Sequence, residues 1–460
     1  MRYLSPLVLT VLLLALVPAA DAQYTLIGWS DFGINWSDSD FSVFAVQPPG
    51  GTIVAQLVDS SGKLVRSGAN VRITYEAVRD PLGAINTTSA GKINFWTLAQ
   101  KLFGLAPAAD TGLSGSAMPG PDNTPRPMVF DAARNRFLAE AVPAVPFDDN
   151  RNAHYYPMFR LVARDASGNL LASTRVVLPV SDEMDCRSCH RSGGVRAATP
   201  IDGWVNDLDV DRDYKLNILR RHDDRQSDSA AYKKALGDAG YSPQGLYATA
   251  TGGQTPVLCV KCHASNLGAR SGMSGISALT VAMHGFHASQ TDPDTGQRLG
   301  DSGERAACYR CHPGPETRFL RGAMGRAVAE DGTPAMHCQS CHGTLGVLAA
   351  SGRRGWLEEP YCQACHTGTA MNNAGQIRFT NAFAGSSWRR FFFTDYATER
   401  DINDGSVVLY RSSRGHGGLQ CAACHGATHA ESPSAHDNDN LQSVDLQGFA
   451  CTLSECGVCH

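Results

Sequence analysis

The pattern Cys-x-x-Cys-His occurs seven times in this chain, and nothing else in the sequence constrains the fold as strongly. With 15 cysteines and 15 histidines among 460 residues, random order would give about 0.02 copies. Every cysteine lies after Asp185, so the constraint falls on the second part of the chain. The motif cysteines are Cys186, Cys189, Cys259, Cys262, Cys308, Cys311, Cys338, Cys341, Cys362, Cys365, Cys421, Cys424, Cys456 and Cys459.

This spacing has a chemical reason. Two thiols three positions apart reach the two vinyl groups of one porphyrin and form thioethers, and the next histidine then falls beneath the iron. Zinc also binds paired cysteines, but it does not require a histidine after every second one, and the same objection applies to thioredoxin-like redox pairs. The sequence therefore predicts seven covalent haem c groups, with proximal iron ligands His190, His263, His312, His342, His366, His425 and His460.

The remaining histidines match the number of predicted haems. Eight lie outside the motifs; His154 stands in the first half of the chain, and seven lie among the motifs. One distal imidazole for each iron is therefore expected, from His222, His284, His287, His337, His416, His429 and His436. His337 precedes Cys338 directly and should ligate a neighbouring haem. His284 and His287, spaced i,i+3, should serve two haems side by side.

Three methionines, Met283, Met324 and Met336, are the alternative distal ligands, although packing is the more common role for this residue. One cysteine, Cys451, belongs to no motif. An unused thiol, an intermolecular disulfide and an unusual ligand all remain open for it.

The first 22 residues have the form of a secretory signal peptide. A basic residue, Arg2, is followed by a short apolar stretch and the small-residue sequence Ala20-Asp21-Ala22. The stretch is too short to span a bilayer. We therefore expect an exported protein with no membrane span in the mature chain, located in the periplasm, on the cell surface or outside the cell.

The charge balance gives no reason to expect nucleic-acid binding. The formal net charge is −4, whereas nucleic acid calls for a basic face. Each haem adds two propionates, and arginine is the better donor for carboxylates because its planar fork bonds both oxygens. Arginines that could fill this role are Arg305, Arg310, Arg318, Arg321, Arg326, Arg389 and Arg390.

Residues 23–180 have a β pattern. Apolar and polar residues alternate over Phe41–Val46, Thr52–Val58 and Val71–Val78, and Tyr156–Asp165 with Leu170–Val180 resembles a hairpin. Short strands with frequent turns predict an all-β sandwich of the immunoglobulin-like kind. Without cysteine, this domain should carry no haem.

Residues 181–460 differ in sequence pattern, because they contain few long runs with periodic apolar residues. Short helices are expected at Asp211–His222, Ala230–Leu236, Ile276–His287 and Thr317–Ala329. Apolar periodicity is too sparse for an ordinary core, so we expect a heptahaem cytochrome c domain, mostly coil with short helices, wrapped around its cofactors.

The motif region resembles the secreted multihaem c-type cytochromes of metal- and sulfur-cycling bacteria, which occur in the periplasm and on the outer surface. The resemblance rests on Cys308–Pro315 with Leu320–Met324, on Cys338–Gly343, on Gly355–Gly368, and on His416–His429. It covers residues 181–460 well and the first half loosely. Some such proteins stack into conductive filaments, so the resemblance implies a homo-oligomer or filament as one form of assembly.

Two functions from different classes follow. The first is electron transfer through seven bis-histidine haems, with other redox proteins or terminal electron acceptors as partners and no catalysis. The alternative is a multihaem oxidoreductase with one open iron acting on a small nitrogen or sulfur species. Because every motif ends in histidine and a distal histidine exists for each haem, the sequence favours the electron carrier.

Overall fold

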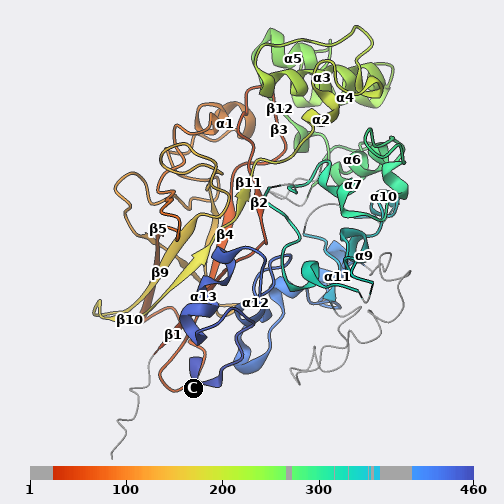
Figure 1. The fold of residues 1–460 in the computed structure, drawn as a ribbon. Coiled ribbons are helices and arrows are strands. Elements are labelled where there is room, and N and C mark those ends of the chain that lie inside the picture. Colours follow the sequence, from red (N-terminus) through yellow and green to blue (C-terminus); the bar gives the residue numbers. More distant parts are fainter. Residues whose placement is uncertain are drawn as a thin grey trace, which may run out of the picture.

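Two four-stranded antiparallel sheets organise the first part of the computed structural model (Figure 1). The structure describes residues 24–265, 272–314, 316–329, 331–350, 352–353, 357–362 and 396–460. The first sheet has the order β1 (Thr25–Ser30), β4 (Gly51–Val58), β8 (Arg136–Val142) and β7 (Val129–Asp131). The second has the order β10 (Leu170–Val177), β9 (Met158–Asp165), β5 (Val71–Val78) and β6 (Arg126–Pro127).

The two sheets share one apolar core. In β5, Ile73, Tyr75 and Ala77 alternate with more exposed residues and point inward, as the period of two in a strand requires. They meet Ile53 and Phe137 of the first sheet. In contrast, β1 is buried along its whole length, because its second face is also covered.

The expected all-β, immunoglobulin-like sandwich for residues 23–180 is wrong. The residues that the structure describes form a mixed α/β protein with 29% helix and 19% strand in several small sheets. A nine-residue helix, α1 (Phe95–Phe103), lies within the first part. Its buried residues Phe95, Ala99 and Leu102 follow a helical repeat that the strand pattern of the surrounding sequence obscured. Gly104, at φ 73°, ends the helix with a left-handed cap.

Two small parallel sheets connect the early chain to later segments. The strand β2 (Asn35–Trp36) pairs with β11 (Val180–Ser181), and β3 (Phe44–Ala45) pairs with β12 (Val257–Leu258). These pairs cross the expected boundary between residues 180 and 181. The division into 23–180 and 181–460 stays a prediction.

The later part consists of short helices joined by loops. The α-helices are α2 (Arg187–His190), α3 (Val210–Gln226), α4 (Ala230–Ala239), α5 (Leu246–Gly252), α6 (Leu279–Ala288), α7 (Arg305–Tyr309), α8 (Ala323–Arg326), α9 (Cys338–His342), α10 (Leu345–Ala350), α11 (Glu399–Asn403), α12 (Cys421–His425) and α13 (Asp437–Gln447). The 3₁₀ turns are η1 (Arg196–Ala198), η2 (Cys259–Lys261), η3 (Leu299–Asp301), η7 (Tyr410–Ser412), η8 (His416–Gly418) and η9 (Cys456–Val458).

These helices agree only partly with the sequence expectations. The expected helices at 211–222, 230–236 and 276–287 correspond to α3, α4 and α6. Within 317–329 only the single turn α8 forms. At α3 the Asp209 carboxylate accepts the backbone N–H groups of Asp211 and Arg212 and so caps the helix.

The C-terminal helices lie on the β part. In Figure 1, α12 and α13 lie beside β1 and β10, and both pairs are in contact. Ile27, Trp29 and Val54 of the first sheet pack against Ala422 and Ala423 of α12. Burial of such large apolar side chains stabilises by roughly 1.5–3 kcal/mol each. The sheets therefore act as a platform for part of the motif region.

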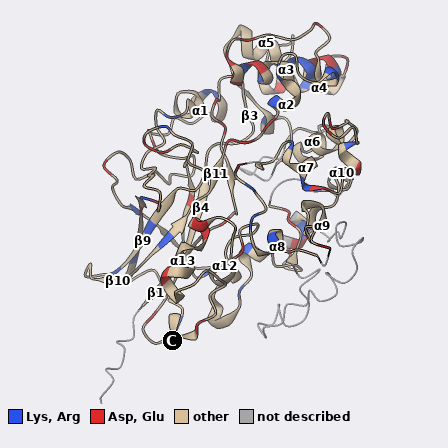
Figure 2. Ribbon diagram, viewed as in Figure 1, with Lys and Arg blue, Asp and Glu red and all other residues tan. Residues whose placement is uncertain are grey.

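Charged residues of both signs are spread over the sheets and helices (Figure 2). None of the helices within the described ranges is long and apolar enough to cross a membrane. The signal-peptide prediction for residues 1–22 lies outside the described residues.

Candidate haem sites

We number the candidate sites 1 to 7 by the order of the motifs. In sites 1, 2, 3 and 7 one helical turn closes the segment from the first cysteine to the histidine. The N–H of the motif histidine donates to the carbonyl of the first cysteine at 2.9 Å in sites 1 and 3, 3.1 Å in site 2 and 3.0 Å in site 7. A helical turn brings residues i and i+3 to one face. Both thiols therefore lie on the side where one porphyrin edge could reach them.

The central observation is that motif histidines face non-motif histidines. Of the six motif histidines that the structure describes, five have an opposing imidazole. The distances between ring centres are 6.4 Å for His190–His287, 6.4 Å for His222–His263, 6.2 Å for His284–His312, 6.1 Å for His342–His429 and 5.9 Å for His416–His460.

These distances match the separation expected between the centres of two imidazole rings that bind one iron. A metal–nitrogen bond of about 2 Å, extended by about 1.1 Å to each ring centre, separates the two centres by about 6.3 Å. Direct stacking of aromatic rings permits much shorter distances, down to about 4.5 Å. The gap between the two rings of each pair is therefore wide enough for one metal ion.

Hydrogen bonds orient several of these rings. The Nδ1 atoms of His263, His284 and His287 lie 2.8 Å from the backbone oxygens of Ser277, Thr280 and Met283. A carbonyl oxygen only accepts, so Nδ1 carries the proton and donates. The lone pair is therefore on Nε2, as in metal-bound histidines whose other nitrogen donates to a carbonyl.

Burial favours the neutral form of three of these rings. Desolvation lowers the pKa of His190 and of His284 to about 4, and that of His429 to about 3. A neutral imidazole retains the lone pair that a metal requires. At neutral pH these histidines are therefore ready to ligate.

Burial shifts the pKa of several motif thiols upward, whereas a hydrogen bond with Cys308 lowers that of Cys338. Burial raises the pKa of Cys311 and Cys424 to about 11 and that of Cys259 to about 12. Redox-active cysteine pairs need a lowered pKa, so the surroundings of Cys259, Cys311 and Cys424 do not suit thiol–disulfide chemistry. No disulfide bond forms among the cysteines that the structure describes.

Zinc also fits poorly. Across the described residues, no cluster of three or more His, Cys, Asp or Glu side chains could hold a metal ion. A structural zinc site needs four protein ligands. Haem iron takes four of its ligands from the porphyrin and asks the protein for only two, which is what each facing pair offers.

The five pairs are connected by the elements that carry them. Helix α6 bears His287 of site 1 and His284 of site 3, placed opposite different motif histidines as their spacing predicts. The ring of Phe319 lies 6.5 Å from His312 of site 3 and 4.4 Å from His429 of site 4. Sites 1, 3 and 4 are therefore neighbours.

Further contacts place site 2 beside site 1, and sites 6 and 7 beyond site 4. Helix α3 carries His222 of site 2, and its Asp211 binds Arg187 of the site 1 motif at 3.2 Å. His429 of site 4 lies four residues after His425 of site 6. Cys459 of site 7 packs against the cluster that contains Ala422 and Ala423 of the site 6 motif. The spatial order of the described sites is thus 2, 1, 3, 4, 6 and 7.

Other predicted ligands lie elsewhere. The ring of His436 stacks on Tyr156, with 3.4 Å between the ring centres, and its Nδ1 accepts the N–H of Asn438 at the start of α13. His337 precedes α9, and its Nδ1 lies 3.4 Å from a carboxylate oxygen of Glu304. Cys365 and His366 of site 5, together with Arg389 and Arg390, lie outside the described residues.

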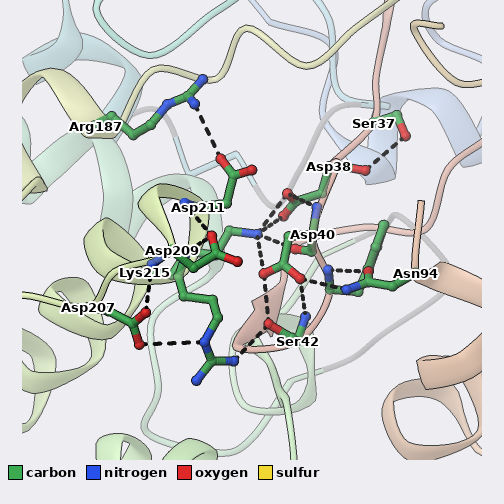
Figure 3. Close-up of polar contacts among 12 residues, drawn as sticks. Ser37, Asp38, Asp40, Ser42, Asn94, Arg187, Asp207, Asp209, Asp211 and Lys215 are labelled. Atoms are coloured by element: carbon green, nitrogen blue, oxygen red, sulfur yellow. Dashed lines mark hydrogen bonds and ion pairs between the residues drawn. The ribbon is translucent and has the colours of Figure 1, made fainter. Parts of the chain in front are cut away.

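Sequence reasoning missed a buried ion pair between sites 1 and 2 (Figure 3). Lys215 of α3 is 0% exposed, and its Nζ lies 2.7 Å from both carboxylate oxygens of Asp38. It also donates to the carbonyl of Asp40. Burial raises the pKa of Asp38, and Lys215 opposes that rise. A lysine within a charged helix such as α3 is normally solvated, so the sequence carries no signal of this pair.

Comparison with known proteins adds no relative: no protein-family model, no curated protein and no solved structure matches the chain.

Proposed function

We propose that this chain is an exported electron-transfer protein that carries seven covalent c-type haems, most of them with two histidine ligands. The observation that supports it best is the set of five facing imidazole pairs at 5.9–6.4 Å. A six-coordinate iron has no position open to a substrate. Such a site exchanges electrons rather than performing chemistry on a bound molecule.

The order of the sites favours a conducting path. Electron tunnelling weakens steeply with distance, so haems must lie close together to pass electrons. Shared supports connect neighbouring sites, namely α3 for sites 2 and 1, α6 for sites 1 and 3, and Phe319 for sites 3 and 4. The partners would be redox proteins or terminal acceptors that meet the ends of this path.

One observation favours a second function for a single site. Among the residues that the structure describes, no imidazole ring lies opposite His425 of site 6, and His436 is engaged with Tyr156. A haem bound there with a weak sixth ligand would accept a small molecule. This is the multihaem oxidoreductase alternative, with a small nitrogen or sulfur species as substrate.

The deciding experiment is a carbon monoxide titration of the reduced holoprotein, normalised to total haem by the pyridine haemochrome assay. Carbon monoxide binds ferrous haem only where the sixth position is open or weakly held. We expect seven haems per chain and a response from at most one of them. His287→Ala should add one responding haem, whereas His154→Ala, which changes a histidine bound to Asp80 in the β part, should add none.

Two results would contradict the proposal. A protein purified from an export-competent host without covalent haem would refute the cofactor. Carbon monoxide binding at most of the haems would refute bis-histidine ligation. A response of one haem in seven that disappears only with site 6 cysteine variants would bring the oxidoreductase function forward.

A further inference from the structure

A cavity lies between the β part and the C-terminal helices. It is bounded by Trp29 of β1, Arg175 of β10, Arg321, Cys424 of α12 and Asp439 of α13. The cavity has a volume of about 50 Å³ and is partly open to solvent. Because Cys424 lines it, the cavity borders candidate site 6.

Two of the residues that line this cavity each have a buried donor without an acceptor among the described residues. The Arg321 side chain is 1% exposed; its Nε lies 2.6 Å from one oxygen of Asp439 and its Nη2 lies 2.7 Å from the carbonyl of Gly33. Its Nη1 has no hydrogen-bond partner in the part of the chain that the structure describes. The same holds for Nε1 of Trp29, which is 4% exposed.

Unpaired buried donors are costly. Each unsatisfied group destabilises the fold by about 1–3 kcal/mol, and a charged one by more. Native proteins therefore rarely leave such groups without a partner. Because both donors belong to residues that line one cavity, an acceptor bound in that cavity would explain them.

The two donors define the chemistry of that acceptor. A guanidinium N–H and an indole N–H can only donate. The nearest carboxylate, Asp439, already accepts from Nε and Nη2 of Arg321, and its Oδ2 also accepts from Ser434. A second cation, Arg175, lines the same cavity, although Asp445 holds it at 2.7 Å. The wall thus favours an anion with oxygen acceptors.

We propose that this cavity is a carboxylate-binding site in which Arg321 Nη1 and Trp29 Nε1 donate to the two oxygens of one carboxylate group. The carboxylate has two sources. One is a propionate of a neighbouring haem, which rests on the proposed function. The other is a free carboxylate or similar small oxyanion that binds from solution.

The test uses the holoprotein and two substitutions. Trp29→Phe keeps an aromatic side chain but removes the N–H donor. Arg321→Lys keeps the positive charge but removes the planar guanidinium group and its Nη1 donor. Trp36→Phe is the matched control, because Trp36 is also a buried tryptophan whose Nε1 has no partner among the described residues, but it does not line the cavity.

If a haem propionate occupies the site, the two substitutions should change the redox potential and the infrared spectrum of the protein. Both variants should shift the midpoint potential of one haem downward in a spectroelectrochemical titration, because the propionate charge loses its donors. The redox-induced infrared difference spectrum should change in the carboxylate region. Acetate should not bind to the wild-type protein, since the site is filled. Trp36→Phe should leave all three readouts unchanged.

If the site instead takes a free anion from solution, added acetate should bind to the wild-type protein. Acetate should bind saturably to the wild type in isothermal titration calorimetry, and Trp29→Phe should weaken it by about tenfold, the loss of one hydrogen bond. The midpoint potentials would then change only on addition of acetate. If both substitutions match Trp36→Phe in potentials, infrared spectrum and acetate titration, the inference is wrong. A protein without haem would refute the proposed function but leave the acetate titration to decide this site.

Discussion

Removing Lys215 should destabilise the protein far more than removing an ordinary surface lysine. The side chains of Lys215 and Asp38 are 0% and 4% exposed, and both Nζ–oxygen distances are 2.7 Å. Lys215→Met leaves the Asp38 carboxylate buried without its cation. Breaking a buried pair from one side costs about 3–5 kcal/mol in unfolding free energy, and we expect a loss in this range.

The complementary change should cost less. Asp38→Asn leaves the lysine charge buried, but a carboxylate oxygen of Asp40 is 3.9 Å from Nζ and offers partial compensation. An asparagine oxygen can still accept the N–H of Asp40, which now donates to Asp38 at 3.2 Å. The double variant removes both charges together, so it should recover most of what Lys215→Met loses.

Urea unfolding at neutral pH, followed by far-ultraviolet circular dichroism, measures the four free energies of this cycle. Lys234→Met is the matched control, because Lys234 also pairs with an aspartate, Asp238, but their side chains are 75% and 48% exposed. An exposed pair of this kind contributes about 0.3–0.5 kcal/mol. The reasoning fails if Lys215→Met costs no more than Lys234→Met, or if the double variant is as unstable as the sum of the single ones.

Three further predictions concern ligation, attachment and pH. His284→Ala and His287→Ala should each turn a different low-spin haem high-spin in the electron paramagnetic resonance spectrum, and identical spectra for the two would contradict the assignment of α6 to two sites. Replacing Cys186 and Cys189 by Ala together should lower the pyridine haemochrome count from seven haems to six, while Cys451→Ala should leave it at seven; equal counts for the two variants would contradict the attachment pattern. Burial raises the pKa of Asp182 to about 6, so the native state holds its proton more tightly than the unfolded chain, and the resulting stabilisation is present at low pH and is lost as pH rises through about 6. Asp182→Asn should therefore reduce the fall in urea-unfolding free energy between pH 4 and pH 7, and an unchanged pH profile would contradict it.

The sequence indicated which residues could form the candidate sites more clearly than it indicated the fold around them. The motif spacing and the number of histidines depend only on neighbouring residues, and they led to the rings that now face each other. Which rings form a pair depends on long-range contacts, as for His342 and His429, and no local pattern encodes it. The ring of His436 packs on Tyr156, a contact that a count of histidines does not reveal.

The fold was predicted less well, for physical reasons that differ between elements. Helix α1 was missed because its nine residues lie among strand-like segments. The sheets β2–β11 and β3–β12 consist of two-residue strands, which are too short to leave a periodic pattern. These parallel pairs form only when distant segments meet, so no local pattern indicates them.

Helix α6 places His284 and His287 one turn apart, between two candidate irons. Its ten residues are held from outside mainly by α10, and the two helices approach so closely that a methyl group added at Gly285 would lie 3.3 Å from Cβ of Ala349. Under the proposed function, opening this one short helix would detach both candidate ligands together, so the two haem sites would share a single local unfolding equilibrium. A substitution that unfolds this helix would then release the distal ligands of both proposed haems, and the proposed path would lose two neighbouring haems together.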